Sequence, residues 1–235
     1  MSRTLLMLCL LALAERAVAQ RPLDGEGQRR VTVAVYLGGS SGGPARDVEA
    51  AMVAGGYTVP FGGCDFLLCV PETPSPSSYS HANPLALSVS YRLHARYAVE
   101  LLIGQGASGT VSGRREDEQL LIEYGGTFVA PLVSLQLGRA HVGLGPALLR
   151  GAWTYSNSSD GREARERTNA LGWIGSAAVE IPIRSRLALR ATGQYRGFGT
   201  TTVRGRRCGG VGTALPSARV RGTHSYFAGG VAVRL

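Results

Sequence analysis

Residues 226–235 read Tyr-Phe-Ala-Gly-Gly-Val-Ala-Val-Arg-Leu, and this alternating stretch decides the fold. Phe227, Val231, Val233 and Leu235 share one parity, whereas the positions between them carry small or polar side chains. Side chains of a β-strand point alternately to the two faces of a sheet, so the pattern predicts a strand with one apolar face. A strand that crosses a bilayer has this period of two, because only its lipid-facing residues must be apolar.

The first 19 residues have the pattern of a secretory signal peptide. Arg3 precedes the apolar run 5–14, and Ala17 and Ala19 supply small residues before a cleavage point. We therefore expect residues 1–19 to be removed and residues 20–235 to form one domain. The apolar run is shorter than the roughly 20 residues that a spanning helix needs, so any membrane crossing is expected to use strands.

The composition favours a barrel whose lumen is lined by small residues. The chain has 33 glycines among 235 residues, only 17% of its residues are charged, and its cationic side chains are all arginine. Its net charge of +9 favours anionic partners. For an exported chain these partners are lipid head groups, so we predict no nucleic-acid partner.

Eight segments alternate in this way, and they lie near 31–38, 85–93, 97–103, 129–137, 142–148, 173–181, 187–195 and 227–235. The connections 94–96, 138–139 and 184–186 are tight, whereas the others are long and rich in Gly, Ser, Pro and Arg. Such asymmetry is typical of transmembrane barrels. We predict an all-β, eight-stranded antiparallel up-and-down transmembrane β-barrel with short periplasmic turns and long extracellular loops.

Hairpin register predicts which charges face the lumen. With 184–186 as a turn, Glu180 falls opposite Arg190, and with 94–96 as a turn, Ser90 faces Glu100. The predicted interior charge network consists of Arg92, Glu100, Glu180, Arg190, Arg196 and Arg234. Outward aromatic residues form two girdles, with Tyr91 and Tyr97 near the tight turns and Trp173, Tyr195 and Phe227 near the long loops. Trp153 and Tyr155 have the opposite parity, which requires a bulge or inward-pointing rings.

This architecture and the ending Gly230-Val231-Ala232-Val233-Arg234-Leu235 resemble the small eight-stranded outer-membrane barrels, the class of the OmpA transmembrane domain and OmpX. The resemblance implies the outer membrane of a Gram-negative cell envelope as the location. It also implies assembly by the barrel-insertion machinery, which reads a Gly followed by spaced terminal hydrophobic residues. Leu235 stands where that class usually has Phe.

The first long loop, about residues 39–83, contains a short predicted helix at 47–54 that ends at Gly55. We interpret the helix as a lid over the barrel mouth or as a surface element. Cys64 and Cys69 follow it, and an oxidising compartment favours a disulfide between them. A bridge from Cys208 to this loop is the competing connectivity.

No motif predicts catalysis, a cofactor or a metal site. Residues 38–42 match the nucleophile elbow G-x-S-x-G, and residues 104–109 match the dinucleotide fingerprint. Both matches are expected by chance in a Gly-rich chain, and neither is followed by the strand and helix pattern that its chemistry requires. The cysteines and His81 lack the spacing of a zinc site. We therefore predict no enzymatic activity, no catalytic or cofactor-binding residue and no metal ligand.

The long loops near the end of the chain carry many arginines. Guanidinium groups pair bidentately with phosphate, and phosphorylated glycolipid forms the outer leaflet of many such membranes. The predicted lipopolysaccharide contacts are Arg204, Arg206, Arg207, Arg219 and Arg221. The alternative is that these charges only solvate the loops.

Eight strands enclose a lumen that side chains can fill, so we predict no wide pore and a structural or surface-interaction role. One alternative is a narrow transporter or binder of small hydrophobic ligands. The other is a secreted, lipocalin-like soluble barrel, in which the apolar face would point into the lumen.

Overall fold

The computed structural model describes residues 31–59, 85–94, 96–116, 118–157, 163–203 and 218–235. The strands are β1 (Val31–Gly42), β2 (Leu85–Arg92), β3 (Tyr97–Gln105), β4 (Gly109–Arg115), β5 (Glu118–Leu137), β6 (Ala140–Asn157), β7 (Glu163–Pro182), β8 (Leu187–Phe198), β9 (Thr200–Val203), β10 (Ala218–Arg221) and β11 (His224–Arg234). One helix, α2 (Ala45–Ala54), follows β1. Among the described residues, no helix is long and apolar enough to span a membrane.

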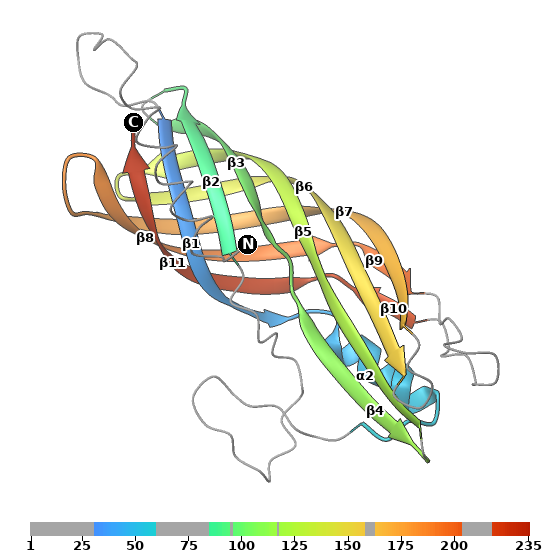
Figure 1. The fold of residues 1–235 in the computed structure, drawn as a ribbon. Coiled ribbons are helices and arrows are strands. Elements are labelled where there is room, and N and C mark those ends of the chain that lie inside the picture. The colour runs from blue at the N-terminus through green and yellow to red at the C-terminus, as the bar shows by residue number, and fades with distance from the viewer. Residues whose placement is uncertain (1–30, 60–84, 95, 117, 158–162, 204–217) are drawn as a thin grey trace.

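Eight of these strands close into an antiparallel barrel (Figure 1). The hydrogen-bonded order is β3-β2-β1-β11-β8-β7-β6-β5, and the pairing of β3 with β5 completes the ring. β1 pairs with β11, so the beginning and the end of the described chain meet in one seam. The predicted fold class and its eight strands are confirmed.

Tight turns join the strands at one end of the barrel, which we call the tight-turn end. Gly138 has a φ of 66° there, whereas Arg139 does not have a positive φ, as a type II′ hairpin requires. Glu180 pairs with Arg190 and Ser90 with Glu100, which is the predicted register.

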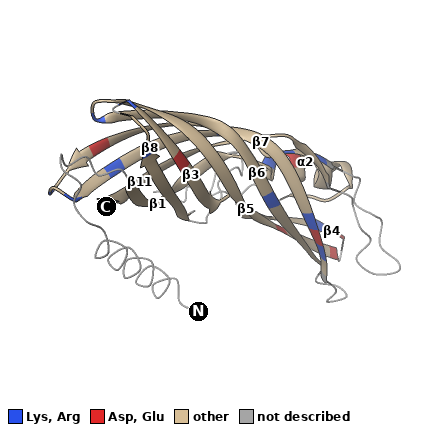
Figure 2. Cartoon of the chain, turned by 90° about the horizontal axis from the view of Figure 1, so that it is seen from above, with Lys and Arg blue, Asp and Glu red and all other residues tan. Residues whose placement is uncertain are grey.

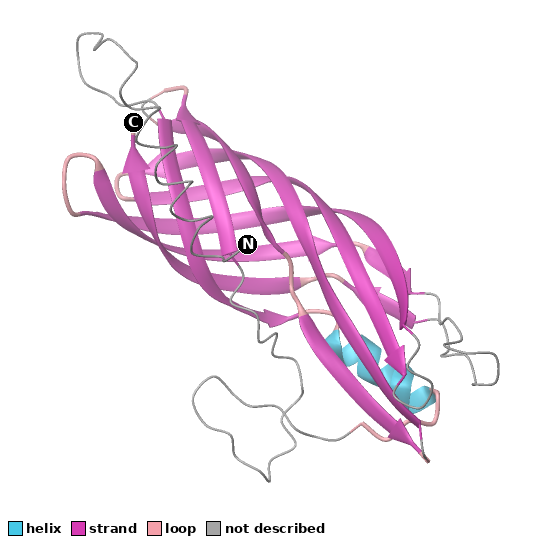
Figure 3. Cartoon of the chain, in the orientation of Figure 1, coloured by secondary structure: helices cyan, strands magenta, loops and turns pink. Residues whose placement is uncertain are grey.

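The opposite, long-loop end differs from the prediction, because the strands continue where loops were expected. β5, β6 and β7 span 20, 18 and 20 residues, about twice the length that a tilted strand needs to cross a bilayer. β4 pairs with the added part of β5, so much of the predicted second loop is a hairpin. β4 and the added parts of β5 to β7 form a curved wall, which we call the extension (Figure 3).

The barrel carries its large apolar side chains on the outside. Exposed residues around the wall include Val99, Leu101, Val133, Leu144, Leu171, Ile181, Leu189 and Phe227. The five girdle aromatics are also exposed on this surface, and the Trp173 and Tyr195 ring centroids lie 5.2 Å apart. We call this surface the apolar belt.

Inside the belt the lumen is filled. Its buried core comprises Ala34, Tyr36, Ala86, Leu102, Phe128, Ala130, Leu132, Ala147, Ile174, Ala188, Phe198, Tyr226 and Ala232. The interior is thus more apolar than the predicted charge network alone implies, because small residues at alternate positions pack around a few aromatic rings that point inward. A lumen filled by side chains leaves no room for a wide aqueous channel.

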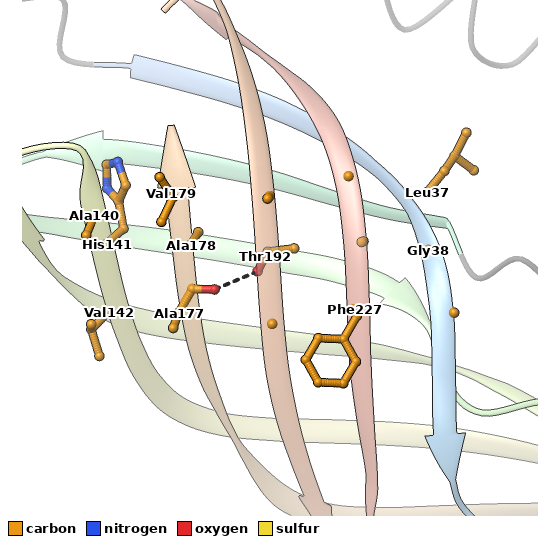
Figure 4. A pocket seen from close by; sticks show the side chains of 15 residues that line it. Leu37, Gly38, Ala140, His141, Val142, Ala177, Ala178, Val179, Thr192 and Phe227 are labelled. Carbon is orange, nitrogen blue, oxygen red and sulfur yellow. Dashed lines mark hydrogen bonds between the residues drawn. The ribbon is translucent and has the colours of Figure 1, made fainter. Parts of the chain in front are cut away.

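One hollow lies on the outer wall, with a volume of about 830 Å³ (Figure 4). It crosses five neighbouring strands at one height and is lined in part by Gly39, Ala177, Ala191, Gly193 and Gly229. Leu37, Val142 and Phe227 line it as well. The hollow therefore arises where outward positions lack side-chain bulk within the apolar belt.

Candidate functional site at the long-loop end

Helix α2 packs against the inner side of the extension, and we call this helix the lid (Figure 1). Ala45, Val48 and Met52 on one helix face are buried, and the helix contacts both β4 and β10. A second core joins them to Tyr57, Val111, Leu120, Ile122, Tyr124, Trp153, Tyr155 and Val220. The rings of Trp153 and Tyr155 therefore point inward, and the strand has no bulge there. Inward-pointing rings were one of the two alternatives that the sequence pattern left open.

Polar contacts fix both ends of this lid. The backbone N–H of Arg221 in β10 donates to Asp47 Oδ2 at 2.8 Å, which ties the first turn of α2 to the last long loop. At the other end, Arg115 donates to the carbonyl oxygen of Gly55 at 3.1 Å and pairs with Glu118 at 2.7 Å. The Arg115 guanidinium also lies 4.7 Å from the centre of the Tyr57 ring.

Two titratable groups under the lid are shifted toward their neutral forms. Burial raises the pKa of Glu49 in α2, although Arg46 opposes the shift, and its Oε1 atom is buried without a hydrogen bond. Burial, with a smaller contribution from the Glu49 charge, raises the pKa of Tyr124 to about 12. Because desolvation disfavours the charged form of an acid, docking of the lid shifts the ionisation equilibrium of both groups toward the protonated form.

Arg196 is fully buried and contacts aromatic residues of the lumen core. Its guanidinium donates to Gln194 Oε1 at 3.0 and 2.8 Å and to the carbonyl oxygen of Gln105 at 2.9 Å. It lies 4.3 Å from the Phe128 ring centre and 4.0 Å from that of Tyr226. Among the described residues no carboxylate forms an ion pair with it, so the aromatic rings and amide oxygens stabilise this cation.

The other predicted interior charges meet nearer the tight-turn end. Arg190 lies 3.5 Å from Glu100, which also accepts a hydrogen bond from Ser134 at 3.2 Å. Glu180 pairs with Arg234 at 2.6 Å, and His141 lies 3.7 Å from it. Arg92 lies in β2 with its Nε atom buried and without a hydrogen-bond partner. Glu180 and Arg190 are therefore neighbours in the strand register, but Glu180 forms its ion pair with Arg234 of β11 and Arg190 forms one with Glu100 of β3.

Several predicted residues lie outside the described part of the chain. These are Cys64, Cys69 and Cys208, together with Arg204, Arg206 and Arg207. Arg219 and Arg221 are described, and both are exposed on β10. Within the described ranges, no cluster of three or more His, Cys, Asp or Glu side chains could hold a metal ion.

The two enzyme-like motifs occupy strands. Residues 38–42 form the end of β1, with Ser40 buried, so no strand-to-helix elbow exposes this serine. Residues 104–109 run from the end of β3 into β4, and no helix starts there. His224 is buried and its Nδ1 atom lies 3.0 Å from the carbonyl oxygen of Gly222.

No family model matches the chain, and no curated protein matches it. Among solved structures it is similar to the outer membrane protein OprG from Pseudomonas aeruginosa, with 11% sequence identity, 89% of this chain and 98% of that chain covered, and a TM-score of 0.47. It is also similar to the outer membrane protease OmpT from Escherichia coli, with 9% sequence identity, 88% of this chain and 97% of that chain covered, and a TM-score of 0.44. A third similar structure is Neisserial surface protein A, with 10% sequence identity, 89% of this chain and 100% of that chain covered, and a TM-score of 0.40. The chain thus resembles outer-membrane barrels, and its own strand pairing shows the barrel independently of these similarities.

Proposed function

We propose that this protein is an outer-membrane barrel with a structural or surface-interaction role and no transport pore. The observation that carries the proposal is the combination of an apolar outer belt with a lumen filled by side chains. Lipid is the environment in which outward Val, Leu and Ile side chains are stable, and two aromatic girdles bound this region. In a soluble, lipocalin-like barrel the same side chains would point into the lumen.

The lid supports a role at the surface. The extension and α2 build a second core beyond the belt, which gives the long-loop end a stable shape. Arg219 and Arg221 are exposed on it, and we propose that they contact lipopolysaccharide together with Arg204, Arg206 and Arg207. Among the described residues, the side chains of the lumen core pack together inside the barrel, so we favour this role over narrow transport.

Fractionation and conductance test the proposal together. We expect the full chain in the outer-membrane fraction, with a gel mobility that changes on boiling because the closed barrel resists detergent. In a planar bilayer the purified barrel should show no steady open conductance. A soluble, heat-insensitive species would contradict the membrane location, and stable channel currents would contradict the filled lumen.

A further inference from the structure

A second hollow, which is polar, lies on the outer wall of the extension, just beyond the apolar belt. It has a volume of about 550 Å³ and is lined by Gln105, Ser108, Thr127, Arg150, Ala152 and Arg167, with the backbone of two glycines. Arg150 lies just after the predicted strand segment 142–148, in a stretch that was expected to be a loop.

The hollow forms where the wall changes strands. β3 ends at Gln105 and β4 begins at Gly109, so three residues leave the regular ladder beside β5. Thr127 pairs with Arg150, and in the next row Gly125 pairs with Ala152. Ala152 also pairs with Arg167 of β7, so this row consists of Gly125, Ala152 and Arg167. The small residues Gly125 and Ala152 leave space beside the side chains of Arg150 and Arg167.

Its height matches the polar boundary of a membrane. Val129, Leu148 and Leu171 are exposed members of the apolar belt on the same three strands. Thr127 precedes Val129 by two residues and Arg150 follows Leu148 by two residues, and two residues span about 7 Å along a strand. A lipid whose acyl chains contact the belt therefore presents its head group at the level of this hollow.

The hollow also carries an uncompensated charge. Arg150 and Arg167 are both exposed, and neither forms an ion pair or a hydrogen bond within the described residues. No carboxylate lines the hollow, whereas Ser108 and Thr127 add hydroxyl groups. In Figure 2, both basic and acidic residues lie on the strands of the extension.

We propose that this hollow binds the phosphate group of an outer-leaflet lipid. The two guanidinium groups would each donate hydrogen bonds to phosphate oxygens, which is the geometry that Arg provides better than Lys. The hydroxyls of Ser108 and Thr127 complete the donor set. This inference rests on the proposed membrane placement and adds a site that is separate from α2 and β10.

Native mass spectrometry of the barrel in mixed micelles tests the proposal. The probes are diphosphoryl lipid A, fully dephosphorylated lipid A and inorganic phosphate, compared for wild type, R150Q/R167Q and R150K/R167K. The matched control is R184Q/R186Q, which removes two exposed arginines from the tight-turn end. Mobility change on boiling is recorded for every variant, so loss of the barrel is distinguished from loss of the site.

We expect wild type and R184Q/R186Q to retain diphosphoryl lipid A at least tenfold better than dephosphorylated lipid A. R150Q/R167Q should lose much of this preference, with the remainder coming from the arginines of the long loops, and R150K/R167K should lie between this variant and wild type. Retention of inorganic phosphate as tight as that of diphosphoryl lipid A would show that a free anion is the ligand and would overturn the lipid assignment. Equal retention by wild type and R150Q/R167Q, with both barrels heat-modifiable, would overturn the site and leave the proposed function intact.

Discussion

At the scale of single residues, the ion pair between Glu100 and Arg190 is the most consequential polar contact in the lumen. Both side chains are nearly inaccessible, and they come from strands that are far apart around the barrel. Removing one partner from a buried pair leaves a charge without compensation, which costs about 3–5 kcal/mol. We therefore expect R190M to lower the free energy of unfolding by about this amount.

Urea titration of the folded barrel in phosphatidylcholine vesicles measures this change. The double variant E100M/R190M should recover most of the lost stability, because no buried charge then remains unpaired. If the effects of E100M and R190M simply add, the pair does not contribute to stability as proposed.

Two prolines mark another feature at this scale. Pro131 in β5 and Pro146 in β6 lie where the ladder between these strands is interrupted, between the pairs Val129–Leu148 and Val133–Leu144. Proline has no backbone N–H to donate. Because Pro131 and Pro146 lie opposite each other in the register, the missing hydrogen bonds are confined to one position in the ladder. The strands approach closely there, and a Cβ atom on Gly145 would overlap the carbonyl oxygen of Pro131.

We therefore expect G145A to lower the free energy of unfolding by about 1–3 kcal/mol, since backbone must shift to admit the methyl group. The control is G229A in β11, where an added Cβ atom would meet nothing within 4 Å. Both variants can be compared by urea titration. Equal stability of the two would contradict the close approach of β5 and β6.

At the scale of elements, α2 should respond to pH through Glu49. Its pKa is higher in the folded chain than in the unfolded chain, so folding favours the protonated form. The stabilisation is fully present below the unfolded pKa and is lost as pH rises through the folded pKa. We expect the docked lid to open more often at pH 8 than at pH 4, and E49Q to remove much of this difference.

Hydrogen exchange of the α2 amides, corrected for the intrinsic rate at each pH, measures lid opening. Exposed Glu116, at the tip between β4 and β5, provides the control variant E116Q. A lid whose protection is independent of pH, or equally altered by E116Q, would contradict the role of Glu49.

Sequence patterns predicted some elements better than others. Period-two alternation and tight turns predicted the register of the barrel hairpins, because lipid contact imposes a strict apolar face on those strands. The same approach missed β4 and the outer half of β5, where Arg114, Arg115 and Glu123 interrupt the pattern. These strands obtain their apolar partners from α2 and β10, which are distant in sequence.

The site was less predictable than the barrel. Parity alone left Trp153 and Tyr155 with two possible orientations, and their partners Val48 and Met52 lie about 100 residues away in the chain. The aromatic environment of Arg196 was equally hidden, since it depends on side chains from β5 and β11. Contacts across a closed barrel cannot be inferred from neighbouring residues.

Across the whole molecule, we propose that the apolar face of the barrel wall points outward into lipid. The chain has two tryptophans that report on opposite faces. Trp173 is 47% exposed in the belt, whereas Trp153 is 6% exposed inside the extension. Each can be isolated by replacing the other with Phe.

The most direct measurement is fluorescence quenching of W153F and W173F in vesicles of brominated phosphatidylcholine, compared with unbrominated vesicles. We predict strong quenching of Trp173 in W153F, because its ring contacts the lipid, and little quenching of Trp153 in W173F. Unquenched Trp173 in a folded, vesicle-bound chain would contradict the outward orientation of the apolar face.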